Sequence, residues 1–180
     1  MSVDLLATRA REMLRHSYAP YSRFKVGAAL ESVTGTVFAG CNVENASYGL
    51  TICAERSAVA QAVAHGHRRF RRLVIVTESD RAVAPCGACC QVVAEFGGGT
   101  QVFSFGNTEE KRWQLTELIP NAFSLAEAGG SVEEGGSAEE GGSAEAAGSA
   151  EAGGSGEAGG PGERGCSAAT GVQGVRTSDV

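Results

Sequence analysis

At the centre of the chain lies Leu73-Val74-Ile75-Val76-Thr77, an uninterrupted apolar run. Such a run is typical of a strand that is covered on both faces of its sheet. Residues 86–96 follow with the pattern of a helix, which the glycine run Gly97–Gly99 ends, and Gln101–Phe105 is the next short strand. This stretch therefore predicts a sheet with helices packed on its faces.

The segments on either side of this stretch complete an alternating order of helices and strands. Apolar spacing and turn residues predict a helix over Asp4–His16, a hairpin of strands over Lys25–Glu31 and Thr36–Val43, a helix over Cys53–His65, a strand over Arg112–Leu115 and a short helix after Thr116. Only residues 106–111 join the last two strands, and a parallel pair needs a crossover of about a dozen residues or more. We therefore expect a three-layer α/β/α fold around a mixed, five-stranded sheet whose last two strands are antiparallel.

Glycine and charge are unevenly distributed along the 180 residues. Sixteen of the 26 glycines and ten of the 21 acidic residues lie after residue 124, whereas every aromatic residue lies at or before Phe123. Residues 129–164 repeat a hexapeptide of the type Gly135-Gly136-Ser137-Ala138-Glu139-Glu140, which lacks the bulky apolar residue that each turn of a β-helix needs. We expect a folded domain over residues 1–126 and a disordered, low-complexity tail over residues 127–180.

Several classes of protein are disfavoured by composition. The sequence contains no apolar run approaching the ~20 residues that span a bilayer, and its first residues lack the apolar core of a signal peptide. Residues 1–124 are nearly neutral and offer no basic surface for nucleic acid. We expect a cytoplasmic protein without membrane or nucleic-acid partners, whose cysteines stay reduced and serve a metal site or catalysis.

Three of the cysteines have a spacing that suits a metal ion. Cys53-Ala54-Glu55 begins one expected helix, and Pro85-Cys86-Gly87-Ala88-Cys89 begins another. Helix N-termini stabilise thiolates, and three thiolates at about 2.3 Å from Zn²⁺ leave the fourth tetrahedral position open for water. Zinc lowers the pKa of such a water, and Glu55 can carry its proton because it is not needed as a ligand. A structural zinc site closed by a fourth ligand is the alternative.

Five blocks of sequence follow the order found in one known family. They are Tyr18–Ser22 with Phe24–Ala29, Gly40–Ala46, Cys53–Arg56, Pro85–Cys89, and Glu117–Pro120 with Phe123. In these blocks residues 1–124 resemble the small, homotetrameric cytidine deaminases. The resemblance implies zinc-dependent hydrolysis of cytidine and deoxycytidine to uridine and deoxyuridine, with Cys53, Cys86 and Cys89 as zinc ligands and Glu55 as the catalytic proton carrier.

The resemblance also implies residues that contact a nucleoside substrate. Asn42 and Glu44 are two apart on an expected strand, so their side chains leave the same face, and an amide beside a carboxylate suits the hydroxyls of a ribose. Further residues follow from the resemblance: Phe24 and Ala54 in the same pocket, and Phe123 and Tyr48 in the pocket of a neighbouring subunit of a homotetramer.

Two residues beside the cysteines affect the charge near the metal. Three thiolates give zinc an excess of negative charge, which the guanidinium of Arg56 could offset by hydrogen bonding to them. Cys90 stands where relatives usually carry an arginine, which removes one positive charge. A residue one step along a helix is rotated by about 100°, so we expect Cys89, and not Cys90, to hold the metal.

Other functions stay open at this stage. A related deaminase could act on a nucleoside antibiotic of the blasticidin type, although the pair Asn42 and Glu44 suits an unmodified ribose. A polynucleotide substrate is disfavoured by the antiparallel last strands and by the lack of basic charge. A zinc-stabilised binding module would leave Glu55 without a role.

Overall fold

The computed structural model describes residues 1–125 of the chain. Its elements keep the predicted order, with two short 3₁₀ helices added. In chain order they are α1 (Val3–Met13), η1 (Leu14–His16), β1 (Val26–Ser32), β2 (Val37–Cys41), η2 (Tyr48–Leu50), α2 (Ala54–Ala64), β3 (Phe70–Thr77), α3 (Gly87–Ala94), β4 (Gln101–Phe105), β5 (Glu110–Gln114) and α4 (Leu115–Leu118). The expected boundary at residue 126 and the expected tail, residues 127–180, lie outside the described residues. Within residues 1–125, every helix is too short or too polar to traverse a bilayer.

The strands form one mixed sheet in the order β2-β1-β3-β4-β5. β1 is antiparallel to both β2 and β3, β3 and β4 are parallel, and β4 and β5 are antiparallel. The prediction of a mixed sheet that ends in an antiparallel pair is therefore confirmed. Its physical reason also holds, since only a tight turn joins β4 to β5, whereas the parallel pair β3 and β4 is connected through α3.

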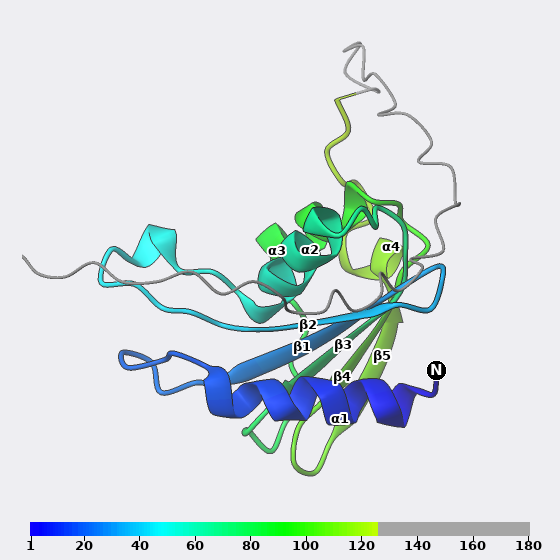
Figure 1. The fold of residues 1–180 in the computed structure, drawn as a ribbon. Coiled ribbons are helices and arrows are strands. Elements are labelled where there is room, and N and C mark those ends of the chain that lie inside the picture. Colours follow the sequence, from blue (N-terminus) through cyan, green and yellow to red (C-terminus); the bar gives the residue numbers. More distant parts are fainter. Residues whose placement is uncertain (126–180) are drawn as a thin grey trace, which may run out of the picture. The chain divides into compact units, whose positions relative to one another are not determined.

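Helices cover both faces of this sheet (Figure 1). Val74 and Val76 of β3 pack with residues of α1, whereas Leu73 and Ile75 pack with residues of α2 and α3 on the opposite face. All four side chains are at most 1% exposed. Because successive side chains of a strand point to opposite faces, a strand covered on both sides shows the uninterrupted apolar run seen in the sequence.

Several strand boundaries differ from the prediction, and the differences at the start of β3 and at the end of β5 have a clear physical reason. β3 begins at Phe70, before the apolar run, and includes two arginines. Because these residues are charged, a hydrophobic pattern does not identify this part of the strand. Leu115 is not the end of the last strand, as expected, but the buried first residue of α4. The side chains of Gln114 and Glu117 each accept a hydrogen bond from the backbone of the other residue, and this capping box starts the helix at that point.

α1 and α2 approach the β1–β2 hairpin from opposite faces, and each meets it at a glycine. A β-carbon at Gly27 would collide with the carbonyl oxygen of Ala10 in α1. A β-carbon at Gly40 would lie 2.7 Å from the carbonyl oxygen of Ala54 and 2.6 Å from the backbone nitrogen of Ala58. Backbone atoms therefore pack directly against backbone atoms at both glycines, and the contact at Gly40 fixes the position of the first turns of α2.

Gly40→Ala should destabilise the protein, because the added methyl group would have to displace backbone atoms of α2. We expect the free energy of unfolding to fall by about 1–3 kcal/mol. Gly99→Ala is the matched control, since a β-carbon there meets nothing within 4 Å. Urea unfolding followed by circular dichroism measures both variants, and equal midpoints would contradict the close packing at Gly40.

Candidate active site

The three cysteines of the sequence motif lie at the first turns of two neighbouring helices. Cys53 directly precedes α2, Cys86 directly precedes α3, and Cys89 lies in the first turn of α3. Within the described residues, neither cap side chain accepts a hydrogen bond from the backbone of its own helix. The N–H groups and the positive dipole ends of both helices are therefore available to stabilise negative charge on sulfur.

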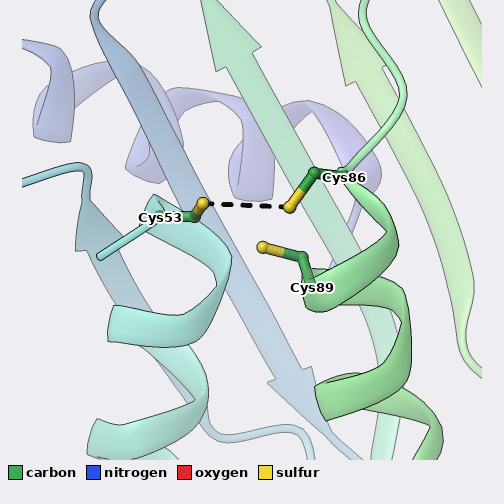
Figure 2. A group of neighbouring side chains, drawn as sticks. All are labelled: Cys53, Cys86 and Cys89. Carbon is green, nitrogen blue, oxygen red and sulfur yellow. Dashed lines mark hydrogen bonds between the residues drawn. The ribbon is translucent and has the colours of Figure 1, made fainter. Parts of the chain in front are cut away.

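The three sulfur atoms converge between the two helices (Figure 2). All lie within 4.8 Å of one another, and the Sγ atoms of Cys53 and Cys86 are 4.0 Å apart. Zinc–thiolate bonds of about 2.3 Å at tetrahedral angles place sulfur atoms about 3.8 Å apart, so this donor set fits a zinc ion. Within residues 1–125, no histidine or carboxylate completes the group to four ligands, which favours an open fourth position over a closed structural site.

The thiols of this cluster differ strongly in acidity. The pKa of Cys53 is lowered to about 5, because the Cys89 thiol donates a hydrogen bond to its thiolate and the Arg56 guanidinium adds a second. The pKa of Cys89 is raised, because Cys53 accepts its proton and because burial disfavours a second charge. The cluster therefore favours a thiolate at Cys53, and a bound cation would favour deprotonation of the other thiols.

Arg56 lies against the cluster and does not extend into solvent. Its Nη2 donates to the backbone oxygen of Thr51 at 2.7 Å and to Sγ of Cys53 at 3.8 Å. Its Nε is buried and has no hydrogen-bond partner among residues 1–125. Contact with Cys53 raises the pKa of Arg56, so its positive charge is held where thiolates gather. This placement suits a residue that offsets the charge of a thiolate-rich metal site.

Glu55 is buried beside the cysteines, with 5% of its surface exposed. Burial raises the pKa of its carboxyl group above the usual range, and the negative charge of Cys53 raises it further. A carboxyl group with a raised pKa can both accept and donate a proton near neutral pH. Glu55 is therefore placed to move protons beside the metal site without serving as a ligand.

A cavity of about 320 Å³ opens beside this cluster. Its lining contains all four residues that the resemblance implies for substrate binding: Phe24, Asn42, Glu44 and Ala54. It also contains Glu55 and two of the cysteines, Cys53 and Cys86. Residues that are far apart in the sequence are thus gathered into one site.

Asn42 uses most of its side chain to hold the segment that precedes β1. Its Nδ2 donates to the carbonyl oxygen of Phe24 at 2.8 Å, and its Oδ1 accepts from the backbone N–H of Val26 at 2.9 Å and from the Ser17 hydroxyl. A carboxamide has two N–H donors, so among the described residues one N–H of Asn42 is left for a ligand.

Glu44 holds the same segment through its carboxylate. It accepts hydrogen bonds from the backbone N–H groups of Tyr21 at 2.9 Å and Ser22 at 3.2 Å, and from the Ser22 hydroxyl. These bonds lower the pKa of Glu44, the Ser22 hydroxyl contributing most. A carboxylate has about four acceptor positions, so one remains after the contacts of Glu44 within the described part of the chain. Asn42 and Glu44 thus contact the same segment, but the prediction that they lie on one face of a strand was wrong, because β2 already ends at Cys41.

The three aromatic residues expected at the site differ in their position relative to the cavity. Phe24 is 40% exposed and lines the cavity, and Tyr48, which the resemblance implies for a neighbour's pocket, borders the cavity of its own chain with 69% exposed. Phe123 lies outside the cavity lining and is 67% exposed. Its backbone is fixed by the Gln91 carboxamide, which accepts from its N–H at 2.9 Å and donates to its carbonyl oxygen at 2.8 Å.

Two further cysteines stay outside the sulfur cluster. Sγ of Cys90 is buried in the core and lies 3.7 Å from the carbonyl oxygen of Pro85. Sγ of Cys41 donates to the carbonyl oxygen of His16 at 3.4 Å. The five cysteines of the described part of the chain all carry free thiols. Cys166 lies outside the described residues.

Two other residues of the cavity carry no signature that a sequence pattern could reveal, whereas a third lies in a recognisable block of sequence. Val83 and Ala84 line it just before the second cysteine motif, and the N–H of Val83 donates to the Ser104 hydroxyl at 3.1 Å. Ser22 lies inside one of the blocks that carry the family resemblance, so its position is visible in the sequence. Its role becomes apparent only from its contact with Glu44.

The family model of the cytidine and deoxycytidylate deaminase zinc-binding region matches residues 2–105. The chain belongs to the cytidine and deoxycytidylate deaminase family. It is 42% identical to the cytidine deaminase of Sporosarcina psychrophila over 126 residues, which cover 69% of this chain and 93% of that protein. It is 43% identical to the cytidine deaminase of Halalkalibacterium halodurans over 126 residues, which cover 69% of this chain and 96% of that protein.

Solved structures of family members share the fold. The crystal structure of cytidine deaminase from Burkholderia pseudomallei matches with a TM-score of 0.66 at 44% identity, over 68% of this chain and 100% of that chain. That of Mycobacterium tuberculosis cytidine deaminase matches with a TM-score of 0.61 at 37% identity, over 69% of this chain and 99% of that chain. Both the predicted fold class and the predicted family are confirmed, and this family member is an enzyme with a zinc-binding domain.

Cys89→Ser should lose most of the bound zinc, whereas Cys90→Ser should retain it. The reason is that Sγ of Cys89 belongs to the convergent sulfur group, whereas Sγ of Cys90 turns into the core. Metal analysis of both purified variants, produced with zinc in the medium, measures the difference. Equal loss of zinc in the two variants would contradict this assignment.

Proposed function

We propose that the chain catalyses the hydrolytic deamination of cytidine and deoxycytidine to uridine and deoxyuridine. The observation that carries this proposal is the buried Glu55 carboxyl group beside three convergent thiols, in one cavity with Asn42 and Glu44. Membership of the family supports the type of reaction, because the relatives named above are cytidine deaminases.

Cys53, Cys86 and Cys89 would hold the zinc ion. When bound, zinc supplies a Lewis acid that lowers the pKa of water towards neutrality. With the metal in place, Glu55 would accept a proton from the attacking water and pass it to N3 of the pyrimidine as the new C4–O bond forms. Glu55 would then carry the remaining proton of the added hydroxyl to the amino group, so that the C4–N bond breaks, the C4 carbonyl forms and ammonia leaves.

Asn42 and Glu44 are suited to grip one sugar hydroxyl together. After their contacts within residues 1–125, Asn42 has one free N–H donor, and Glu44 has one free acceptor position. A hydroxyl can accept from the first and donate to the second at the same time. If this hydroxyl is the one that ribose and deoxyribose share at the 3′ position, both nucleosides fit.

The charge of the cavity favours a nucleoside over a nucleotide. Among the described residues that line it, two are carboxylates, Glu44 and Glu55, and none is a lysine or arginine. A phosphate group would enter without a cation to pair with and would be repelled by the ionised Glu44. The proposed substrates are therefore the free nucleosides, although the family also includes deoxycytidylate deaminases.

A cytoplasmic role in pyrimidine salvage follows from these proposed substrates. Free nucleosides are the form in which pyrimidines are recovered, and deamination converts cytidine into a uridine that other enzymes can use. The free thiols of the described residues, three of which are gathered into one group, suit a reducing compartment.

A homotetramer, in which neighbouring chains complete each cavity, also belongs to this proposal. Large apolar side chains are exposed in the two segments that carry Phe24 and Tyr48; they are Tyr18, Tyr21, Phe24, Val43, Tyr48, Leu50 and Ile52. The segment around η2 projects from the sheet (Figure 1). Exposed apolar surface of this kind marks an interaction site. The Phe123 ring, exposed on a backbone that Gln91 fixes, is arranged for contact with another chain.

Purified, zinc-loaded protein should convert cytidine and deoxycytidine to their uracil products and release ammonia, and it should leave deoxycytidylate unchanged. Glu55→Gln should lower turnover by about 10²–10⁴-fold, because the proton carrier is lost, while zinc stays bound. Ultraviolet absorbance follows the reaction, and metal analysis follows the zinc. Blasticidin S and single-stranded DNA are tested beside the nucleosides.

Each outcome of this assay has a definite meaning. Turnover of blasticidin S without turnover of cytidine would replace the proposed substrate by the antibiotic. No turnover of any compound by zinc-loaded protein would leave a structural zinc module as the better account. Native rates in Glu55→Gln would exclude the proposed proton carrier.

Mixing two impaired variants should restore activity if Phe123 completes a neighbour's cavity. Glu55→Gln has an inactive cavity but supplies Phe123, whereas Phe123→Ala has an intact cavity and lacks the ring. Mixed oligomers, formed by dissociating and reassociating the two proteins together, should be more active than either variant treated alone. Light scattering should give the mass of four chains. A monomer, or a mixture no more active than its components, would contradict the shared cavity.

A further inference from the structure

One loop, residues 18–24, carries both the aromatic ring of Phe24 and the groups that donate hydrogen bonds to Glu44. Residues 18–24 form a turn in which the N–H of Arg23 donates to the carbonyl oxygen of Ala19 at 3.0 Å. Arg23 has a φ of 58°, a left-handed conformation that is unfavourable for a residue with a side chain. Such a conformation persists only where the surroundings fix it, so the contacts that hold this turn matter for the position of Phe24.

The Ser22 hydroxyl stands at the centre of those contacts. It hydrogen-bonds to Oε1 of Glu44, and it accepts the backbone N–H of Phe24 at 3.0 Å. An N–H group can only donate, and an ionised carboxylate can only accept, so the single hydroxyl proton of Ser22 must point to Glu44. The hydroxyl therefore ties the carboxylate to the residue that presents the aromatic ring.

We propose that Ser22 is a positioning residue that fixes Glu44 and Phe24 relative to each other, so that the sugar and the base of a nucleoside are bound in one geometry. This inference rests on the proposed function, because it assigns Ser22 to the binding of that same substrate. Ser22 also lines the cavity, so it lies beside the groups that it positions.

The groups that move protons do not depend on this hydroxyl. Glu55 lies at the start of α2, and the sulfur group is built from the first turns of α2 and α3. None of the hydrogen bonds of Ser22 within the described residues reaches these helices. Loss of the Ser22 hydroxyl should therefore weaken substrate binding and leave the chemical step largely intact.

The test compares three variants with the native, zinc-loaded protein. Ser22→Ala should raise KM for deoxycytidine roughly ten-fold or more, since a hydrogen bond to a charged group is lost, with a change in kcat of less than about three-fold. Ser22→Thr keeps a hydroxyl and should stay near the native KM. Thr8→Ala is the matched control, because it removes an exposed hydroxyl that bonds to a carbonyl oxygen of α1; it should leave both constants unchanged.

The outcomes separate this inference from the proposed function. Circular dichroism and zinc content identify a variant that has lost its fold, and in that case Ser22→Thr, which differs from Ser22 by one methyl group, carries the comparison. A native KM in Ser22→Ala, a loss of kcat in place of a rise in KM, or a KM in folded Ser22→Thr as high as in Ser22→Ala would overturn the role of Ser22 alone. Inactivity of native and Thr8→Ala protein would overturn the proposed function and, with it, this inference.

Discussion

The site depends on three sulfur atoms from two helices meeting within 4.8 Å. β2 and β3 run in the same direction because each is antiparallel to β1, and β4 runs parallel to β3. The helices that follow β2 and β3 therefore both begin at the carboxyl edge of these strands, on the same face of the sheet. Topology alone thus directs two positive helix ends at one point, and the cysteines occupy that point.

The pKa values of two glutamates in one cavity are shifted in opposite directions by their surroundings. Glu55 loses contact with water, which raises its pKa, whereas Glu44 is surrounded by hydrogen-bond donors, which lower its pKa. The first can therefore exchange a proton, and the second stays a fixed acceptor. Charge and surroundings also match at Arg56, whose guanidinium cation lies beside Cys53, where negative charge accumulates on sulfur.

The order of elements and the convergence of three cysteines could be predicted, because both depend on local sequence patterns. Apolar periodicity marks each element, and the spacing of Cys53, Cys86 and Cys89 reflects two helix starts. The arginine-rich start of β3 could not be predicted, because it pairs with neighbouring strands without being apolar. The hydrogen bonds by which Asn42 and Glu44 hold the segment before β1 could not be predicted either, because they join segments that only the folded chain brings together.

The two glycine contacts of the β1–β2 hairpin bear on how such an enzyme can change during evolution. Core side chains can exchange volume with one another over many substitutions, because a loss at one position is compensated at the next. At Gly27 and Gly40 backbone meets backbone, so no side chain is available for such an exchange. The distance from α1 through the hairpin to α2 is therefore insensitive to substitutions in the core, and the end of α2 next to Cys53 can keep its place while the rest of the interior diverges.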